Sequence, residues 1–146
     1  MSEIIYRTLT GQEYNPEIYH FLKDSIIQFD NIESGVANYH LVFLLEMCKK
    51  LGYSPEIRKD ITPGMLFDIP SARFLENGES SSICLGREES DILFRLENTP
   101  AEQLSSIKIS GKQRYEFIKA MIKYLTFHSG HEIRVESLDV LREVFE

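Results

Sequence analysis

Glu17 and His20 have the Glu-x-x-His spacing with which helical bundles present two metal ligands on one face. A di-iron site needs two copies of this motif and two further carboxylates from neighbouring helices, and the chain contains the motif once. His20, Asp24 and Ser25 supply the residue types of a hydrolytic triad, but His and Asp four residues apart are just as typical of a helix surface. We therefore expect no metal site, no cofactor and no catalytic centre around these residues.

The remaining histidines and the cysteines show no stronger pattern. His128 and His131 lie on either side of Gly130 without a cysteine or carboxylate at ligand spacing, so we expect them to be exposed polar residues. Cys48 and Cys84 form no C-x-x-C motif, and Cys48 falls in an apolar run that favours a buried, reduced thiol. The sequence also lacks a Gly-rich phosphate loop and a G-x-S-x-G nucleophile elbow. It predicts a protein that is not an enzyme.

Positive charge is confined to two clusters on an acidic chain. The net charge is −7, the wrong sign for a surface that binds phosphate backbones everywhere. Residues 1–34, 76–107 and 124–146 carry −4, −5 and −3, whereas residues 108–123 carry +4 and residues 35–75 carry +1. An anionic partner would be met locally, and a solvated charged face on each helix is the alternative. The candidate binding residues are Lys49, Lys50, Arg58, Lys59, Lys108, Lys112, Arg114, Lys119 and Lys123.

Aromatic side chains near these clusters could stack on unpaired bases if they are exposed. Tyr53, Tyr115 and Tyr124 are the candidates, and a place in the core is the alternative for each of them. We assign three phenylalanines to the core: Phe43, Phe117 and Phe127.

The elements that must position these side chains are helices. Within residues 35–52, the run LVFLL at 41–45 is apolar on every helical face, whereas a surface helix carries one apolar stripe. A helix of this length spans roughly 24 Å, less than the ~30 Å hydrocarbon core of a bilayer, and charged residues interrupt it. The segment is predicted to be the buried central helix of a small domain, ended by Gly52 at the C′ position.

Capping residues mark the other helices. Asn15 and Pro16 begin a helix that runs to about residue 32, Ser110 begins one that runs to about residue 128, and Ser137 caps a last helix. The apolar side of the Ser110 helix is expected to carry Tyr115, Ile118, Ile122 and Leu125, and to be widened by Met121. That of the last helix is expected to carry Leu138, Leu141 and Phe145.

The segment between these helices is less regular. Residues 54–83 are predicted to be irregular, with a short hairpin over residues 65–75, and a helix follows over residues 88–97. Pro100 opens another short helical turn. The predicted fold class is mostly α: one domain over residues 1–146, built as a small helical bundle around a buried central helix with a short irregular or β-hairpin insertion.

Three segments together resemble one family. Residues 35–55, GVANYHLVFLLEMCKKLGYSP, are similar to the first core helix of the C-terminal domain of the RecO family of DNA repair proteins. Asn15-Pro16 and the helix after them resemble the helix before that one, and SLDVLREVF at 137–145 resembles the family's closing motif. The order and spacing of the segments match over nearly the whole chain.

The resemblance implies an oligonucleotide-binding barrel upstream of Met1, so that the chain would be the C-terminal part of a longer protein. It also implies that many relatives hold a four-cysteine zinc site in the irregular region after the core helix. Residues 54–85 contain only Cys84, so we expect no zinc here. The hairpin segment must then be held together by packing.

For function, the resemblance implies a recombination mediator of the RecFOR pathway that works with RecR and DNA, anneals strands and helps to load RecA. It associates the helical domain with docking the acidic, hydrophobic-ended tail of single-stranded-DNA-binding protein. Such a tail needs an apolar pocket with cations around its rim. Direct DNA binding by the two basic clusters is the alternative, and a metal-dependent enzyme built on Glu17 and His20 is a third. Without a signal peptide or a membrane-spanning run, the sequence predicts a cytoplasmic protein.

Overall fold

The computed structural model describes the backbone of residues 1–145 and the side chains of residues 1–140 and 142. Its elements follow in the order α1 (Ser2–Leu9), α2 (Pro16–Asp30), α3 (Val36–Lys50), β1 (Phe67–Asp68), β2 (Arg73–Phe74), α4 (Arg87–Asn98), the 3-10 helix η1 (Ala101–Ser106), α5 (Gly111–Ser129) and α6 (Ser137–Phe145). The predicted mostly α fold with a hairpin insertion is confirmed.

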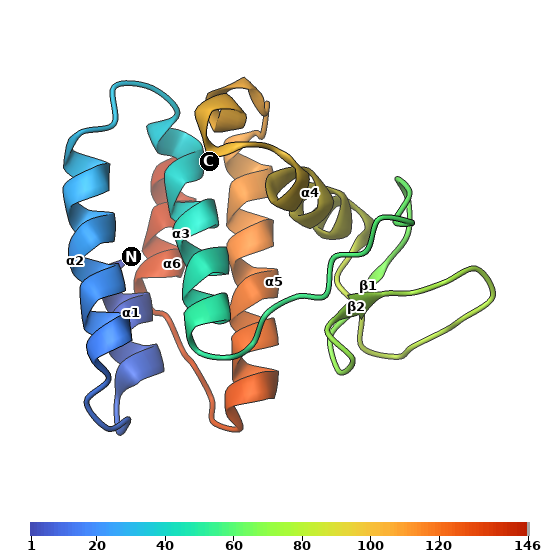
Figure 1. The fold of residues 1–146 in the computed structure, drawn as a ribbon, viewed down its shortest axis with the longest axis horizontal. Coiled ribbons are helices and arrows are strands. Elements are labelled where there is room, and N and C mark those ends of the chain that lie inside the picture. Colours follow the sequence, from blue (N-terminus) through green and yellow to red (C-terminus); the bar gives the residue numbers. More distant parts are fainter. Residues whose placement is uncertain (146) are drawn as a thin grey trace.

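Helix α3 is the centre of the bundle (Figure 1). It contacts α2, α5 and η1, and Leu41, Leu44, Met47 and Cys48 are each at most 1% exposed. Because neighbours cover α3 on several sides, its burial is not confined to one stripe. This confirms the predicted buried central helix. None of the helices in the described part of the chain is long and apolar enough to cross a membrane.

The end of α3 is set by Gly52, as predicted. Gly52 has a φ of +86°, a left-handed conformation that costs glycine no Cβ clash. The N–H of Tyr53 donates to the carbonyl of Cys48 at 2.9 Å, and the N–H of Gly52 donates to the carbonyl of Lys49 at 3.0 Å. These two bonds form a Schellman motif, which satisfies the last carbonyls of the helix.

Helix α5 lies beside α3 (Figure 1), and its buried side agrees only in part with the predicted one. Met121, Leu125 and Phe117 are at most 1% exposed, as expected, and so is Tyr124. The other three residues expected on the apolar side are half-buried: Tyr115, Ile118 and Ile122. Since α3, α4 and α6 all contact α5, several of its sides are covered. Periodicity alone therefore could not select the most buried one.

The N-terminal caps of α2 and α5 form as predicted. The side chain of Asn15 accepts hydrogen bonds from the N–H groups of Glu17 and Ile18 at 2.9 and 3.4 Å. Ser110 and Gln113 form a reciprocal capping box at the start of α5. The start of each helix is therefore determined locally, because every hydrogen-bond partner of the cap lies within three residues of it in the sequence.

The cap of α6 comes from the other end of the chain. Ser137 was expected to be the N-cap, but it is the first helical residue. The carboxylate of Glu3 in α1 accepts hydrogen bonds from the N–H groups of Glu136 and Ser137, both at 2.8 Å. The expectation was wrong because a side chain more than 130 residues away satisfies these N–H groups. Leu138 is buried, as expected, whereas Leu141 and Phe145 lie outside the described side chains.

The predicted hairpin is confirmed as β1 and β2, which pair antiparallel with Phe67 opposite Phe74. The two rings have centroids 5.3 Å apart, and both residues belong to the core. The N–H of Phe67 donates to the hydroxyl of Ser90 on α4 at 3.0 Å. The hairpin and its loops project to one side of the helices (Figure 1), attached through these contacts.

Ion pairs add to this packing. Arg73 pairs with Glu79 at 2.8 Å, and Arg58 pairs with Glu76 at 2.9 Å. Asp68 accepts a hydrogen bond from the N–H of Ser71 at 2.9 Å. Burial opposes ionisation of Asp68, but hydrogen bonds from Ser71 and Ser81 outweigh it and lower the pKa of its carboxyl. The segment therefore combines apolar packing with charge pairing, where packing alone was expected.

Candidate partner-docking surfaces

The structure separates only part of the two predicted basic clusters. Lys108 and Arg114 lie where both helices begin, because residues from the start of each line the same depression. Lys50 is the last residue of α3. At 1.5 Å per residue, the length of α3 puts Lys50 about 20 Å from that start. Lys112, Lys119 and Lys123 continue along α5, so the second cluster is a stripe along this helix rather than a group at one end.

Lys49 is held in the fold. Its ammonium group donates to Glu46 at 2.8 Å and to Glu97 of α4 at 3.0 Å. Partial burial disfavours the charged form, but the hydrogen bonds to the two carboxylates outweigh it and raise the pKa of Lys49. Its charge is directed at α4, so Lys49 is a poor candidate for a partner contact.

Arg58 is also engaged with carboxylates, through its ion pairs to Asp60 at 2.6 Å and Glu76 at 2.9 Å. The hydrogen bonds that the guanidinium donates to these two carboxylates raise the pKa of Arg58, although the group is charged in any case. Lys50 and Lys59 are exposed. Of this cluster, Lys50 and Lys59 are the side chains best placed to meet an anion.

On α5, Lys112, Lys119 and Lys123 are exposed and share one helical face with Glu116. Lys119 pairs with Glu116 at 3.6 Å and lies 5.3 Å from the centre of the Tyr115 ring, within cation–π range. No ion pair is found for Lys112 or Lys123 within the described residues. The stripe thus keeps two unpaired cations.

A depression with a volume of about 570 Å³ lies at the shared start of α3 and α5. We call it the α3–α5 groove. Its lining combines apolar Ala37, Ile107 and Ile109 with the basic residues Lys108 and Arg114. In the α3–α5 groove, candidate basic residues lie next to apolar residues. An acidic tail with a hydrophobic end would require this combination.

The backbone adds positive potential to the α3–α5 groove. Helix α3 begins at Gly35 without a side-chain cap, so its first N–H groups have no side-chain acceptor. One guanidinium nitrogen of Arg114 donates to the carbonyl of Ile109 at 2.6 Å, which fixes the side chain beside the groove. The groove is therefore preformed and suited to an anionic group.

The aromatic residues considered for base stacking differ in burial and in their contacts. Tyr124 is fully buried and its hydroxyl donates to the carbonyl of Tyr53 at 3.0 Å, so Tyr124 cannot stack on a base. Tyr53 stacks on His128 with ring centroids 5.8 Å apart, and Tyr115 is half-buried beneath Lys119. Phe127, expected in the core, is 46% exposed. That expectation was wrong because α5 presents Phe127 to solvent at the turn after Leu125.

The histidines and cysteines also have defined places. His128 is half-buried rather than exposed, because a ring nitrogen lies 2.8 Å from the carbonyl of Ile69. Cys48 is a fully buried free thiol, as expected, and burial raises its pKa to about 12. Glu17 and His20 are both exposed. Within the described residues, no group of three or more His, Cys, Asp or Glu side chains is placed to hold a metal ion.

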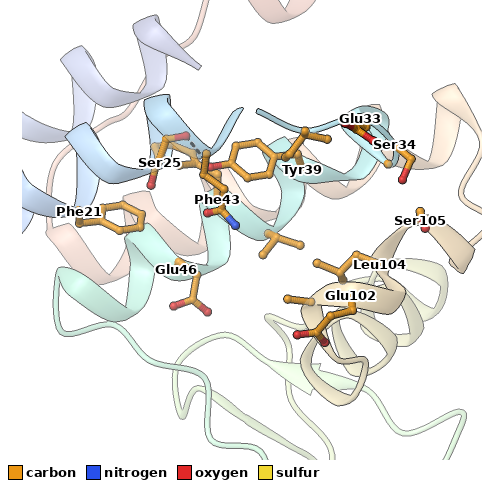
Figure 2. A pocket seen from close by; sticks show the side chains of 15 residues that line it. Phe21, Ser25, Glu33, Ser34, Tyr39, Phe43, Glu46, Glu102, Leu104 and Ser105 are labelled. Carbon is orange, nitrogen blue, oxygen red and sulfur yellow. Dashed lines mark hydrogen bonds between the residues drawn. The ribbon is translucent and has the colours of Figure 1, made fainter. Parts of the chain in front are cut away.

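A second depression was not predicted from the sequence. It lies between α2, α3 and η1, with a volume of about 320 Å³ (Figure 2). Phe21, Val42 and Leu104 form apolar walls, while Glu33 and Glu102 also line it. We call it the Glu-rimmed cleft. Its residues come from three distant segments, each of which looks like an ordinary helix face, so the sequence contains no local signal for it.

The structure is a small helical domain with a hairpin insertion and two depressions on its surface. Over residues 1–137 the sequence matches the family described as Recombination protein O C terminal, and the chain belongs to that family. This confirms the resemblance seen in the sequence.

Relatives named DNA repair protein RecO align over essentially the whole chain. The chain is 28% identical over 146 residues to the one from Christiangramia forsetii, covering 99% of this chain and 59% of the relative. It is 24% identical to the one from Azobacteroides pseudotrichonymphae, covering 100% and 60%. The chain therefore spans about 60% of the length of these relatives. No solved structure matches it.

Proposed function

We propose that this chain is the partner-docking domain of a RecO-type DNA repair protein, a cytoplasmic recombination mediator that is not an enzyme. In this proposal the α3–α5 groove receives the acidic, hydrophobic-ended tail of single-stranded-DNA-binding protein. The whole protein would work with RecR and DNA, anneal strands and help to load RecA. Membership of the Recombination protein O C-terminal family and the names of the relatives support the DNA repair role.

The observation that carries the proposal is the composition of the α3–α5 groove. Ala37 and Ile107 offer apolar surface for the end of a tail, while Lys108 and Arg114 stand beside them. The uncapped start of α3 adds N–H groups that favour a carboxylate. On a chain with a net charge of −7, this local arrangement would attract an acidic peptide that the rest of the surface repels.

The test is a fluorescence anisotropy titration with a labelled peptide that has an acidic stretch and an apolar C-terminal end. We expect saturable binding at low salt, and the double variant Lys108→Glu with Arg114→Gln should weaken it about tenfold or more. Lys23→Glu with Arg134→Gln changes the net charge equally at two exposed sites outside the groove and is the matched control, which should leave binding nearly unchanged. Absence of saturable binding, or an equal loss in the control, would contradict the proposal.

The alternative is direct DNA binding, which the unpaired Lys112 and Lys123 on the exposed face of α5 favour. The same titration with a labelled oligonucleotide separates the two. Binding to phosphates falls steeply with salt, because each neutralised phosphate releases counterions. If oligonucleotide affinity shows this slope and is lost in Lys112→Glu with Lys123→Glu while the peptide does not bind, DNA binding replaces tail docking as the function of this chain.

A further inference from the structure

The Glu-rimmed cleft is an apolar depression left open by the described chain. The rings of Phe21 on α2 and Phe43 on α3 stack with centroids 5.4 Å apart, and Val42 and Leu104 extend the apolar walls. Its volume of about 320 Å³ lies at the small end of the range of ligand pockets. A depression of this size accommodates a few apolar side chains of a partner rather than a folded element.

The walls of the cleft are held rigidly. The hydroxyl of Tyr39 donates to the carbonyl of Ser25 at 2.7 Å and so ties α3 to α2 (Figure 2). On the η1 side, Gly35 lies so close to Ser105 that a Cβ on residue 35 would meet the Cβ of Ser105 at 3.1 Å. Because the walls are already in place, a partner would not need to order them on binding.

All charged side chains that line the cleft are glutamates: Glu33, Glu46 and Glu102. Glu46 is paired with Lys49 at 2.8 Å, whereas no ion pair is found for Glu33 or Glu102 within the described residues. Figure 2 shows Glu46 on α3 and Glu102 on η1 on opposite sides of the space between the two elements. An acidic peptide or DNA would be repelled here, and a cationic partner would be attracted.

We propose that the Glu-rimmed cleft binds a short segment of another protein in which apolar side chains are flanked by lysine or arginine. The apolar side chains enter between Phe21, Val42 and Leu104, and the basic groups reach Glu33 and Glu102. This site is distinct from the α3–α5 groove and takes a partner of the opposite charge. It gives the domain a second docking surface, which does not depend on tail binding in the α3–α5 groove.

The experiment selects a displayed library of random short peptides on the full chain and measures the affinity of the enriched peptides by fluorescence anisotropy. We expect enrichment of peptides with apolar residues next to Lys or Arg. The rim variant, Glu33→Lys with Glu102→Lys, should weaken their binding about tenfold, the size expected for two exposed charge contacts. Ala101→Trp, an exposed position on η1 that lines the cleft, should block it.

The matched control is Glu13→Lys with Glu132→Lys, which changes the net charge equally at two exposed sites outside the cleft. Enriched peptides without basic residues, or an equal loss of affinity in the control, would overturn the proposal. So would self-association of the chain that the rim variant abolishes, because the occupant would then be a second copy. Acidic-peptide binding measured on the same variants reports on the α3–α5 groove separately, so failure at one site is distinguishable from failure at the other.

Discussion

Lys49 illustrates how a basic residue near the end of a buried helix can serve the fold. Its side chain links Glu46 on α3 to Glu97 on α4, and the side chain of Glu97 is only 10% exposed. One carboxylate oxygen of Glu97 is buried without any other hydrogen-bond partner. The charge of Lys49 is therefore what makes the burial of Glu97 tolerable, because a buried carboxylate without its partner is costly.

We predict that Lys49→Met lowers the free energy of unfolding by about 2 kcal/mol, since it leaves Glu97 buried and unpaired. Chemical denaturation measures the loss. Lys50→Met, one residue away and exposed, is the control and should change stability by less than about 0.5 kcal/mol. Adding Glu97→Gln to Lys49→Met should recover part of the loss, and a double variant as unstable as the single one would refute this explanation.

For the basic residues, the sequence predicted the positions of the charges but not which of them are paired in the fold. Local charge counts located all nine candidate cations, but they could not tell that Lys49 and Arg58 are neutralised. Each has one local partner, Glu46 or Asp60, but the second partners Glu97 and Glu76 lie 48 and 18 residues away, and only the fold brings these together. The role of the nine residues in binding stays a prediction.

At the scale of elements, the junction between α2 and α3 depends on Gly35. This residue begins α3 with a φ of +79° and lies against Ser105 of η1. It also lines both the α3–α5 groove and the Glu-rimmed cleft. A side chain at this position would meet both a conformational and a steric obstacle.

We predict that Gly35→Ala destabilises the fold by at least about 1 kcal/mol more than Gly52→Ala, as measured by chemical denaturation. Both residues have positive φ, so both variants carry the strain of about 1 kcal/mol that a left-handed residue with a Cβ incurs. At Gly35 the new Cβ would also lie 3.1 Å from the Cβ and 3.2 Å from the Cα of Ser105, whereas at Gly52 nothing lies within 4 Å. Equal losses would show that the contact with Ser105 can relax.

The elements were largely predictable because their ends are encoded locally. Asn15 with Pro16, Gly52 and Ser110 with Gln113 each act within a few residues, and the structure has all three. The sequence-based expectations failed where distant contacts decide. Glu3 replaces Ser137 as the cap of α6, and His128 is drawn inward by the carbonyl of Ile69. The Glu-rimmed cleft could not be predicted from the sequence for the same reason, because three distant segments form it.

For the whole molecule, several ion pairs and caps depend on ionised carboxylates. Hydrogen bonds from Ser137 and the N–H of Glu136 lower the pKa of Glu3 to about 2, and Arg73 lowers that of Glu79 to about 2. The ordinary value for both is 4.5. Between these values the unfolded chain binds more protons than the folded one, so acid favours unfolding. The stabilisation is complete above pH 4.5 and is lost as the pH falls towards 2.

We predict that the thermal unfolding midpoint is nearly constant from neutral pH down to about pH 5 and then falls steadily as the pH is lowered towards 2. Glu3→Gln should lower the midpoint at neutral pH and reduce its further fall in acid, because the group that titrates is gone. Glu13→Gln, at an exposed site, is the control. Scanning calorimetry over this pH range measures both effects, and a Glu3→Gln profile parallel to that of the unmodified chain would contradict the assignment.

The bond between Glu3 and the start of α6 also has a consequence for the order of folding during synthesis. Glu3 leaves the ribosome well before its partners Glu136 and Ser137, which are made more than 130 residues later. The α2–α3 pair and its capped ends can form from local contacts long before that. Helix α1 must therefore wait until α6 has been made before it reaches its final contacts.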